Sequence, residues 1–300
     1  MPSGYLHKRC AEEAARRAGL PIAAPEAYLL GAMGADPLFM LGIFPLRLNS
    51  RPLRYGHMVH QRRTGAFLLA LLRQGRAGGA AAHGFALGFL THYALDTTVH
   101  PYVYAHSVGS DGRYHSRIHM RLEKQWDTLF FRQDGGRGTA VTTPGIAEAQ
   151  AIWPEIAAIW ARATAEVFPG EALSEAMALK ALQDAARANR LTHSPRGGKY
   201  ALVWAAERII GKAGLATAQM APRFLPRGDF VNAGHRPWRN PAAPGVKRSE
   251  GLAELWEAAL EKAQALLLAG DKYLSGEMAE AEMARAIGNL GYGTGVEAEA

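Results

Sequence analysis

The sequence is poor in the features that mark secreted, disulfide-bonded or membrane-spanning proteins. Cys10 is the only cysteine in 300 residues, which excludes an internal disulfide framework and any cysteine-rich zinc motif. The start, MPSGYLHKRCAEEAARR, has no apolar core of the kind that secretory signals contain, so we expect a cytoplasmic protein. The most apolar window, residues 80–95, is too short for a membrane span and carries two histidines.

The sequence also lacks β-strand patterns and internal repeats. No stretch alternates apolar and polar residues for long enough to predict a sheet, whereas apolar residues recur at helical spacing. We therefore predict an all-α fold with a loop over residues 34–54. The predicted helices cover residues 8–18, 25–31, 57–73, 79–99, 114–131, 146–167, 171–190, 198–213 and 249–268.

Positive charge exceeds negative charge. The 34 Lys and Arg against 27 Asp and Glu leave a formal net charge of +7. This balance favours an anionic partner, such as a phosphate ester, a nucleic acid or an acidic membrane surface. A basic surface without such a partner is the alternative.

Histidines are concentrated in the first part of the chain, where nine of the eleven lie between His7 and His119. His92, Asp96 and His100 are four residues apart, so each step turns by only about 40° and the side chains share one strip of a helix. A second series with the same spacing contains His115, His119, Glu123 and Asp127. Two such strips on neighbouring helices would form a metal site inside a helical bundle. Nitrogen and oxygen ligands without thiolates favour zinc over iron or manganese.

The other histidines separate into candidates and controls. His57 and His60 share a helix face, and only one of them needs to be a ligand. His83 precedes His92 by nine residues, about half a turn round the helix, so we expect it to face away from the metal. His193 lies in a predicted loop without a partner nearby.

Several segments together resemble the bacterial zinc-dependent phospholipase C family, which shares its fold with the P1-type nucleases. The matching segments are GYLHKR at 4–9, GAMGADPLF at 31–39, GHMVHQ at 56–61, GFLTHYALDTTVHPYVY at 88–104, HMRLEKQWD at 119–127 and, more weakly, residues 235–263. The resemblance implies a multi-helix bundle of the phospholipase C/P1 nuclease type. We expect a single domain over residues 1–290, with a metal-ligand half at 1–131, a Gly-rich linker, a helical remainder at 146–290 and a flexible tail at 291–300.

The resemblance also implies a set of zinc ligands. One zinc ion would be held by Asp36, His60, His92 and Asp96. A second would be held by His119 and Glu123 with a third imidazole, for which His100 and His115 compete. A further ion would bind His7 and share Asp96. Secreted members use a free terminal residue as a ligand, which Met1-Pro2-Ser3 does not match, so the sequence leaves two or three ions open.

The chemistry of such a cluster predicts a phosphodiesterase. Zinc ions would offset the charge of a phosphodiester and lower the pKa of a water molecule from 15.7 to about 7. Asp36 is the candidate catalytic residue, because a carboxylate is needed to orient that water. Five arginines near the His57–His60 segment are candidates for phosphate recognition: Arg47, Arg51, Arg54, Arg62 and Arg63.

Two classes of function follow. The favoured one is a zinc-dependent phosphodiester hydrolase that acts on a phospholipid. Within this class, the alternative is a P1-like nuclease that acts on nucleic acid. The other class is a non-catalytic helical protein that binds metal. The ligands are too few to close every zinc coordination shell, which favours the enzyme. Peripheral contact with a membrane is compatible with the basic charge, and no protein partner is inferred.

Overall fold

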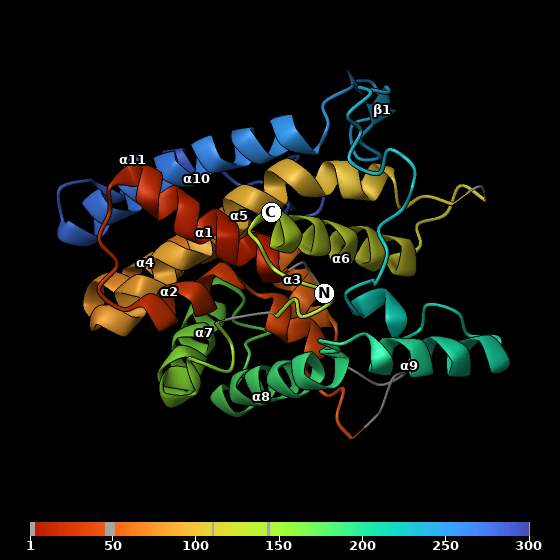
Figure 1. Ribbon diagram of the computed structural model, residues 1–300. Helices are drawn as coiled ribbons and strands as arrows, with labels where there is room; N and C mark the ends of the chain where they lie inside the picture. Colours follow the sequence, from red (N-terminus) through yellow and green to blue (C-terminus); the bar gives the residue numbers. More distant parts are fainter. Residues whose placement is uncertain (1–3, 46–51, 110, 143–144, 300) are drawn as a thin grey trace.

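The structure, a computed structural model, describes residues 4–45, 52–109, 111–142 and 145–299. These residues form eleven α-helices, short 3₁₀ turns and one small two-stranded ribbon (Figure 1). The predicted all-α class is therefore confirmed. The first elements are α1 (Gly4–Ala18), α2 (Pro25–Ala32), the 3₁₀ turn η1 (Asp36–Met40), α3 (Arg54–Gln61), α4 (Thr64–Ala77), α5 (Ala80–Ala105) and α6 (Ser116–Gln133).

The second part of the chain packs round the first. Its elements are η2 (Gln150–Ile152), α7 (Trp153–Val167), α8 (Glu175–Thr192), α9 (Gly198–Ile209), η3 (Thr217–Gln219), β1 (Trp238–Arg239), β2 (Lys247–Arg248), α10 (Leu252–Ser275) and α11 (Glu280–Ile287). The strands β1 and β2 pair antiparallel. One hydrophobic core joins residues from both parts, from Leu6 on α1 to Tyr292 near the C-terminus.

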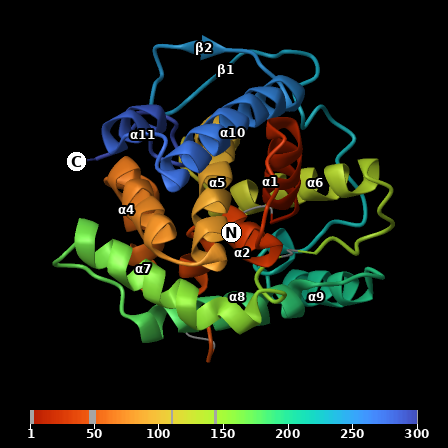
Figure 2. The ribbon, with the colours of Figure 1, turned by 90° about the vertical axis from the view of Figure 1, so that its left-hand side faces the viewer.

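The long helix α5 occupies the centre of the molecule, with α1, α2, α4 and α10 around it (Figure 2). Most of its side chains are buried. Its contact with α2 depends on glycine, since a Cβ on Gly88 would lie 1.9 Å from the carbonyl oxygen of Tyr28 and one on Gly31 would lie 2.1 Å from that of Phe85. The two helix backbones can therefore approach closely, which holds the metal-binding end of α5 next to the segment that follows α2.

Some helix boundaries differ from the sequence prediction. The predicted helix 57–73 is two helices, α3 and α4, because the chain turns at Arg63, whose φ is 45°. Helix α5 continues through Pro101 to Ala105 rather than ending near Val99. The predicted loop 34–54 contains the turn η1 with Asp36, which places that carboxylate beside α5.

The C-terminal segment is packed rather than frayed, contrary to the sequence prediction for residues 291–300. The amide of Tyr292 donates to the carbonyl oxygen of His60, and the Tyr292 side chain is fully buried. The amide of Arg63 donates to the carbonyl oxygen of Glu299. The sequence of the tail, which is rich in glycine, gave no sign of this packing. The contacts are with residues more than 200 positions earlier in the chain, so no local pattern could predict them. Residue 300 itself lies outside the described part.

Lys262 on α10 places its amine in the contact between α10 and α5, beside two side chains of α5. Its Nζ donates to Thr97 Oγ1 at 2.7 Å and lies 4.9 Å from the centre of the Tyr93 ring. Burial lowers the pKa of Lys262 to about 8. The folded protein therefore binds this proton less tightly than the unfolded chain does. The resulting loss of stability is full below about pH 8 and fades as the pH rises to about 10.

We expect Lys262→Met to raise the free energy of unfolding at pH 7 by about 1 kcal/mol, after allowance for the lost hydrogen bond. The gain should disappear above about pH 10, where the lysine is neutral in both states. Urea unfolding at the two pH values measures both effects. Equal stability of the two proteins at pH 7 would contradict the burial of a charged amine.

Candidate metal centre

Four buried side chains from three elements form the first group of candidate ligands. They are Asp36 on η1, His60 on α3, and His92 and Asp96 on α5, and one potential ligand atom from each lies within 4.8 Å of those of the others. His60 Nε2 is 3.2 Å from Asp36 Oδ1, and His92 Nε2 is 3.2 Å from Asp96 Oδ2. The four-residue spacing on α5 thus brings an imidazole and a carboxylate to one point, as the helical strip predicts.

Backbone carbonyls set the orientation of both imidazoles. His60 Nδ1 donates to the carbonyl oxygen of Gly56 at 2.7 Å, and His92 Nδ1 donates to that of Ala32 at 3.2 Å. With Nδ1 protonated, Nε2 is left as the lone-pair nitrogen, and in each ring it points to a carboxylate of the group. A hydrogen bond to the remote nitrogen is the usual way in which proteins orient a metal-binding histidine.

The second group contains His100 from α5 with His119 and Glu123 from α6. Glu123 Oε1 lies 2.9 Å from His100 Nε2 and 3.1 Å from His119 Nε2. His100 Nδ1 is 3.5 Å from Asp96 Oδ2, so the second group adjoins the first through His100. The structure therefore brings His92, Asp96, His119 and Glu123 into one region at the place where α5 meets α6.

The alternative third imidazole, His115, lies outside both groups. It is the residue before α6, its backbone is extended, and its side chain is 43% exposed. Its Nε2 lies 2.9 Å from Asp111 Oδ1 instead. The spacing from His115 to His119 does not put the two on one strip, because the helix begins only after His115.

His7 on α1 lies beside Asp96 and adds an imidazole from a fourth helix, after α3, α5 and α6. Its Nε2 is 3.3 Å from Asp96 Oδ1 and 4.0 Å from Asp36 Oδ2, and its ring stacks on His92 with 4.4 Å between centres. Asp127 is the last residue of the four-residue series on α6. It is not in either ligand group, and its Oδ1 accepts a hydrogen bond from the amide of Leu6 on α1 at 3.0 Å.

Electrostatics favour the forms that bind a cation. Burial raises the pKa of Asp96, but His100, His92 and His7 around it hold the net value well below its usual range. Burial lowers the pKa of His92 to about 4, so this imidazole is neutral near pH 7. Although burial lowers the pKa of His100, Asp96 and Glu123 raise it to about 9. A bound cation would replace the proton of His100, because only a neutral imidazole is a ligand.

The unsatisfied polar atoms in the interior test whether these residues suit a metal. Five buried atoms of the two groups and His7 have no hydrogen-bond partner among the described residues: His7 Nδ1, His92 Nε2, Asp96 Oδ2, His119 Nδ1 and Glu123 Oε2. Leaving buried polar atoms unpaired costs about 1–3 kcal/mol each. Imidazole and carboxylate donors without a thiolate are those that zinc accepts, so the residues fit a zinc cluster.

An open cavity of about 400 Å³ gives access to both groups. Asp36, His60, His100, His119 and Glu123 all line it. Tyr104 and Tyr114, whose rings stack with 5.1 Å between centres, line it as well, together with apolar side chains of Phe39, Met40, Leu53 and Met120. The cavity thus combines a charged floor with partly apolar walls.

The predicted arginine cluster does not line this cavity in the described part of the chain. Arg62 pairs with Glu171, and Arg63 donates to the carbonyl oxygen of Val167. Arg54 donates to the hydroxyl of Tyr55. Arg47 and Arg51 lie outside the described residues.

Tyr292 is a residue near the metal centre that sequence reasoning missed. Its ring packs against His60 and His92, with 4.9 and 5.6 Å between ring centres. Its hydroxyl is buried without a hydrogen-bond partner among the described residues, and burial raises its pKa well above 10. No local pattern could identify it, since it lies in a Gly-rich segment far from every ligand in sequence.

Histidines outside the groups provide controls for ligation. His83 lies on the opposite side of α5, and its side chain is 38% exposed near Asp271. His193 faces the carbonyl oxygen of Val141. We expect His92→Ala to remove about one zinc ion or more per chain, since structural and catalytic zinc needs three or four protein ligands.

His83→Ala and His193→Ala should retain the zinc content of the unsubstituted protein. Mass spectrometry of the metal in purified protein measures all three variants. Equal zinc loss in all of them would show that destabilisation, and not loss of a ligand, depletes the metal.

Comparison with known proteins agrees with this geometry. The family model of zinc dependent phospholipase C matches residues 6–168, more than half of the chain, and this range includes both ligand groups and His7. No curated protein and no solved structure matches the chain. Among the described residues, no helix is long and apolar enough to cross a membrane. The family match and the buried imidazole–carboxylate groups lead to one conclusion: the chain belongs to the zinc dependent phospholipase C family.

Proposed function

We propose that this protein hydrolyses the phosphodiester of a phospholipid and releases the phosphorylated head group. The observation that carries the proposal is that side chains from both ligand groups line one open cavity: Asp36 and His60 from the first, and His100, His119 and Glu123 from the second. A closed structural zinc site would be shielded from substrate, whereas Asp36, His100 and Glu123 are in contact with the cavity. Apolar side chains on the cavity walls suit the glyceride part of a lipid.

The proposed ligand set follows the two groups. Asp36, His60, His92 and Asp96 would hold one zinc ion, and His100, His119 and Glu123 a second. His7 would share Asp96 with a third ion, so the proposed content is two or three ions per chain. Bound zinc would offset the charge of the phosphodiester and supply hydroxide at neutral pH by lowering the pKa of water.

Asp36 is the proposed catalytic residue. It lines the cavity, with Oδ1 3.2 Å from His60 Nε2 and Oδ2 3.8 Å from His92 Nδ1. A carboxylate in this position can accept a hydrogen bond from water and aim it at phosphorus. Asp36 would therefore act both as a ligand and in positioning the attacking water.

The test compares the zinc-loaded protein with the chelated protein on phosphatidylcholine, single-stranded DNA and a nitrophenyl phosphodiester. We expect hydrolysis that depends on zinc, with phosphatidylcholine as a substrate. Asp36→Asn should reduce the rate by about 100-fold, more than it reduces zinc content, because loss of acid–base positioning typically costs 10²–10⁴-fold. The exposed Asp111, which pairs with His115, supplies the matched control Asp111→Asn.

Each outcome decides between the alternatives. Turnover of DNA alone would show that the protein is a nuclease and not a phospholipase. In that case Tyr104 and Tyr114 would be the candidates for stacking on the bases. No turnover of any substrate by the zinc-loaded protein would favour a non-catalytic metal-binding protein. Equal losses of rate and zinc in Asp36→Asn would leave Asp36 as a ligand only.

A further inference from the structure

Helix α9 projects from the body of the molecule (Figure 1) and carries an unusual distribution of residues. Glu207 is its only buried residue, whereas Leu202 and Ile209 are 75% and 85% exposed. Leu202 and Ile209 are seven residues apart and share one face, and Glu207 lies about 140° away from Leu202. The helix therefore turns its carboxylate inward and its aliphatic side chains outward, the reverse of an ordinary surface helix.

The inward carboxylate has a structural role. Glu207 accepts hydrogen bonds from the amide of Gly214, at 2.8 Å, and from the amide of Thr217, at 2.9 Å. These bonds close the segment 210–217 against the helix. The outward face has no comparable contacts in the described part of the chain, and Phe224, in the segment that follows, is 78% exposed.

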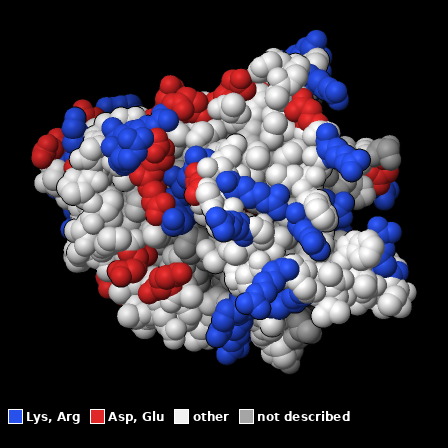
Figure 3. Space-filling view, in the orientation of Figure 1, with Lys and Arg blue, Asp and Glu red and all other residues white. Residues whose placement is uncertain are grey.

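The positive charge of the protein is concentrated in the same part of the chain. Residues 187–228 contain eight of the 34 Lys and Arg but only one of the 27 Asp and Glu, so this segment accounts for the whole net charge of +7. Its one acid is Glu207, which is buried. In Figure 3, Lys and Arg side chains lie beside the largely uncharged surface over α9.

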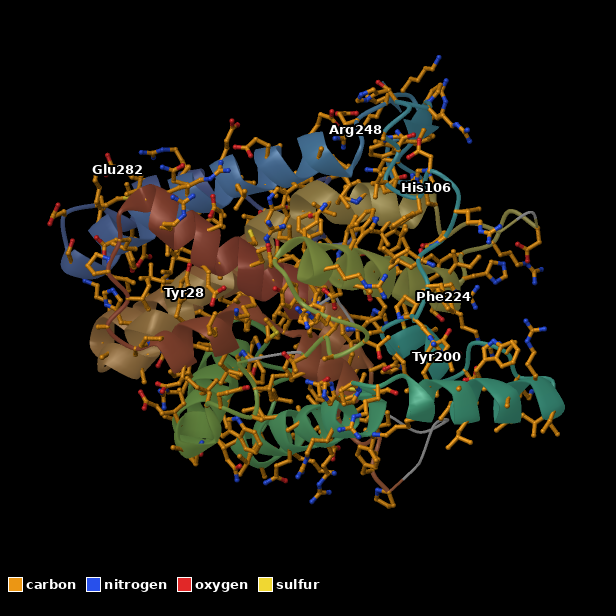
Figure 4. The ribbon with its side chains drawn as sticks, viewed as in Figure 1. Tyr28, His106, Tyr200, Phe224, Arg248 and Glu282 are labelled. Carbon is orange, nitrogen blue, oxygen red and sulfur yellow. The ribbon has the colours of Figure 1, made fainter. Side chains whose placement is uncertain are left out.

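A second cavity connects this surface with α6. Tyr200 and Phe224, labelled in Figure 4, line a cavity of about 220 Å³ together with Trp204, and Arg121 and Arg208 line it as well. Cations beside aromatic rings are suited to anionic groups at the boundary between water and an apolar phase.

The projecting surface adjoins the metal cavity. Helix α6 carries His119 and Glu123 toward that cavity, while Arg117 Nη1 on α6 donates to the carbonyl oxygen of Ala213 at 3.3 Å. Gln219, at the end of η3, lines the metal cavity. Docking through α9 would therefore place the cavity next to whatever surface α9 contacts.

We propose that α9 and residues 210–227 dock on the surface of a bilayer that contains anionic phospholipid. Exposed aliphatic side chains enter the boundary between head groups and acyl chains, and Lys and Arg attract the anionic head groups. A nucleic acid would use the positive charge but gain nothing from Leu202 and Ile209. The inference deepens the proposed function, because it rests on a phospholipid as the substrate, but docking is measured without turnover.

Vesicle flotation of the zinc-loaded full chain tests the proposal. We expect binding to mixed phosphatidylcholine–phosphatidylglycerol vesicles to exceed binding to pure phosphatidylcholine by about tenfold or more. The double variant L202E/I209E should lose about tenfold or more of that binding, and R208E/K212E should lose the preference for anionic lipid. The matched control is V246E/L268E, which places two glutamates at exposed apolar positions on other elements.

The outcomes separate docking from catalysis. Unchanged flotation of L202E/I209E, or equal loss in V246E/L268E, would overturn the proposal. Binding of duplex DNA without binding of vesicles would also overturn it and assign the surface to nucleic acid. Hydrolysis of monomeric short-chain phosphatidylcholine should be equal in the unsubstituted protein and L202E/I209E. Vesicle binding without any lipid hydrolysis would support docking while contradicting the proposed function.

Discussion

Asp96→Asn is expected to remove zinc and activity together. Asp96 contacts three imidazoles, with Oδ1 3.3 Å from His7 and Oδ2 3.2 Å from His92 and 3.5 Å from His100. The substitution preserves shape but removes the one charge that both ligand groups share, so bound cations would repel each other more strongly. We expect zinc affinity to fall by about 100-fold or more, since even indirect partners of metal ligands are worth 10–100-fold.

Zinc titration and turnover of a nitrophenyl phosphodiester measure this effect. The matched control is Glu207→Gln, which removes a buried carboxylate charge that belongs to neither ligand group. That control should reduce stability without changing zinc content. Retention of full zinc affinity in Asp96→Asn would rule out Asp96 as the residue shared between the metals.

Gly34→Ala is the second substitution expected to have a large effect, although Gly34 is no ligand. Its φ is +53°, and a Cβ at this position would lie 2.1 Å from Cδ2 of the His92 ring. The His92 ring is fully buried and held by the carbonyl oxygen of Ala32, so it cannot move aside without losing its position beside Asp96. We expect loss of zinc binding and a fall of about 3 kcal/mol or more in the free energy of unfolding, typical of overpacking plus backbone strain.

Gly19→Ala separates strain from steric overlap. Gly19 has a similar φ of +63°, but an added Cβ would meet no atom within 4 Å. This control should lose only about 1–2 kcal/mol, the cost of a left-handed conformation for a residue other than glycine, and should bind zinc normally. Equal zinc binding in Gly34→Ala and Gly19→Ala would show that the His92 ring is not held as tightly as its contacts imply.

The sequence predicted those parts of the metal centre that depend on helical phase. His92, Asp96 and His100 converge because each follows the last by four residues on one helix, and His83 faces away because it is half a turn out of phase. His119 and Glu123 follow the same rule on α6. Such relations are local, so they survive without knowledge of how the helices pack.

The choice between His100 and His115 could not be made by spacing alone. Both lie four residues from another candidate ligand, yet His115 has an extended backbone at the residue before α6, while His100 lies inside α5. Where α6 begins depends on the segment before it, in which the amide of His115 donates to the carbonyl oxygen of Ser107 and Val108 pairs with Tyr114. The four-residue spacing alone does not reveal this turn.

The sequence by itself determined the helical class, the two series of candidate ligands with four-residue spacing, and the preference of their nitrogen and oxygen atoms for zinc. Periodicity and donor chemistry are properties of short segments, so they can be recognised without the fold. Only the tertiary structure decided that Asp36 and His60 meet α5, that His7 lies on Asp96, and that the C-terminal Tyr292 packs on the ligand rings. It also showed that α9 turns aliphatic side chains outward. These relations join residues far apart in the chain, and the packing of helices, not the pattern within any one of them, establishes their distances.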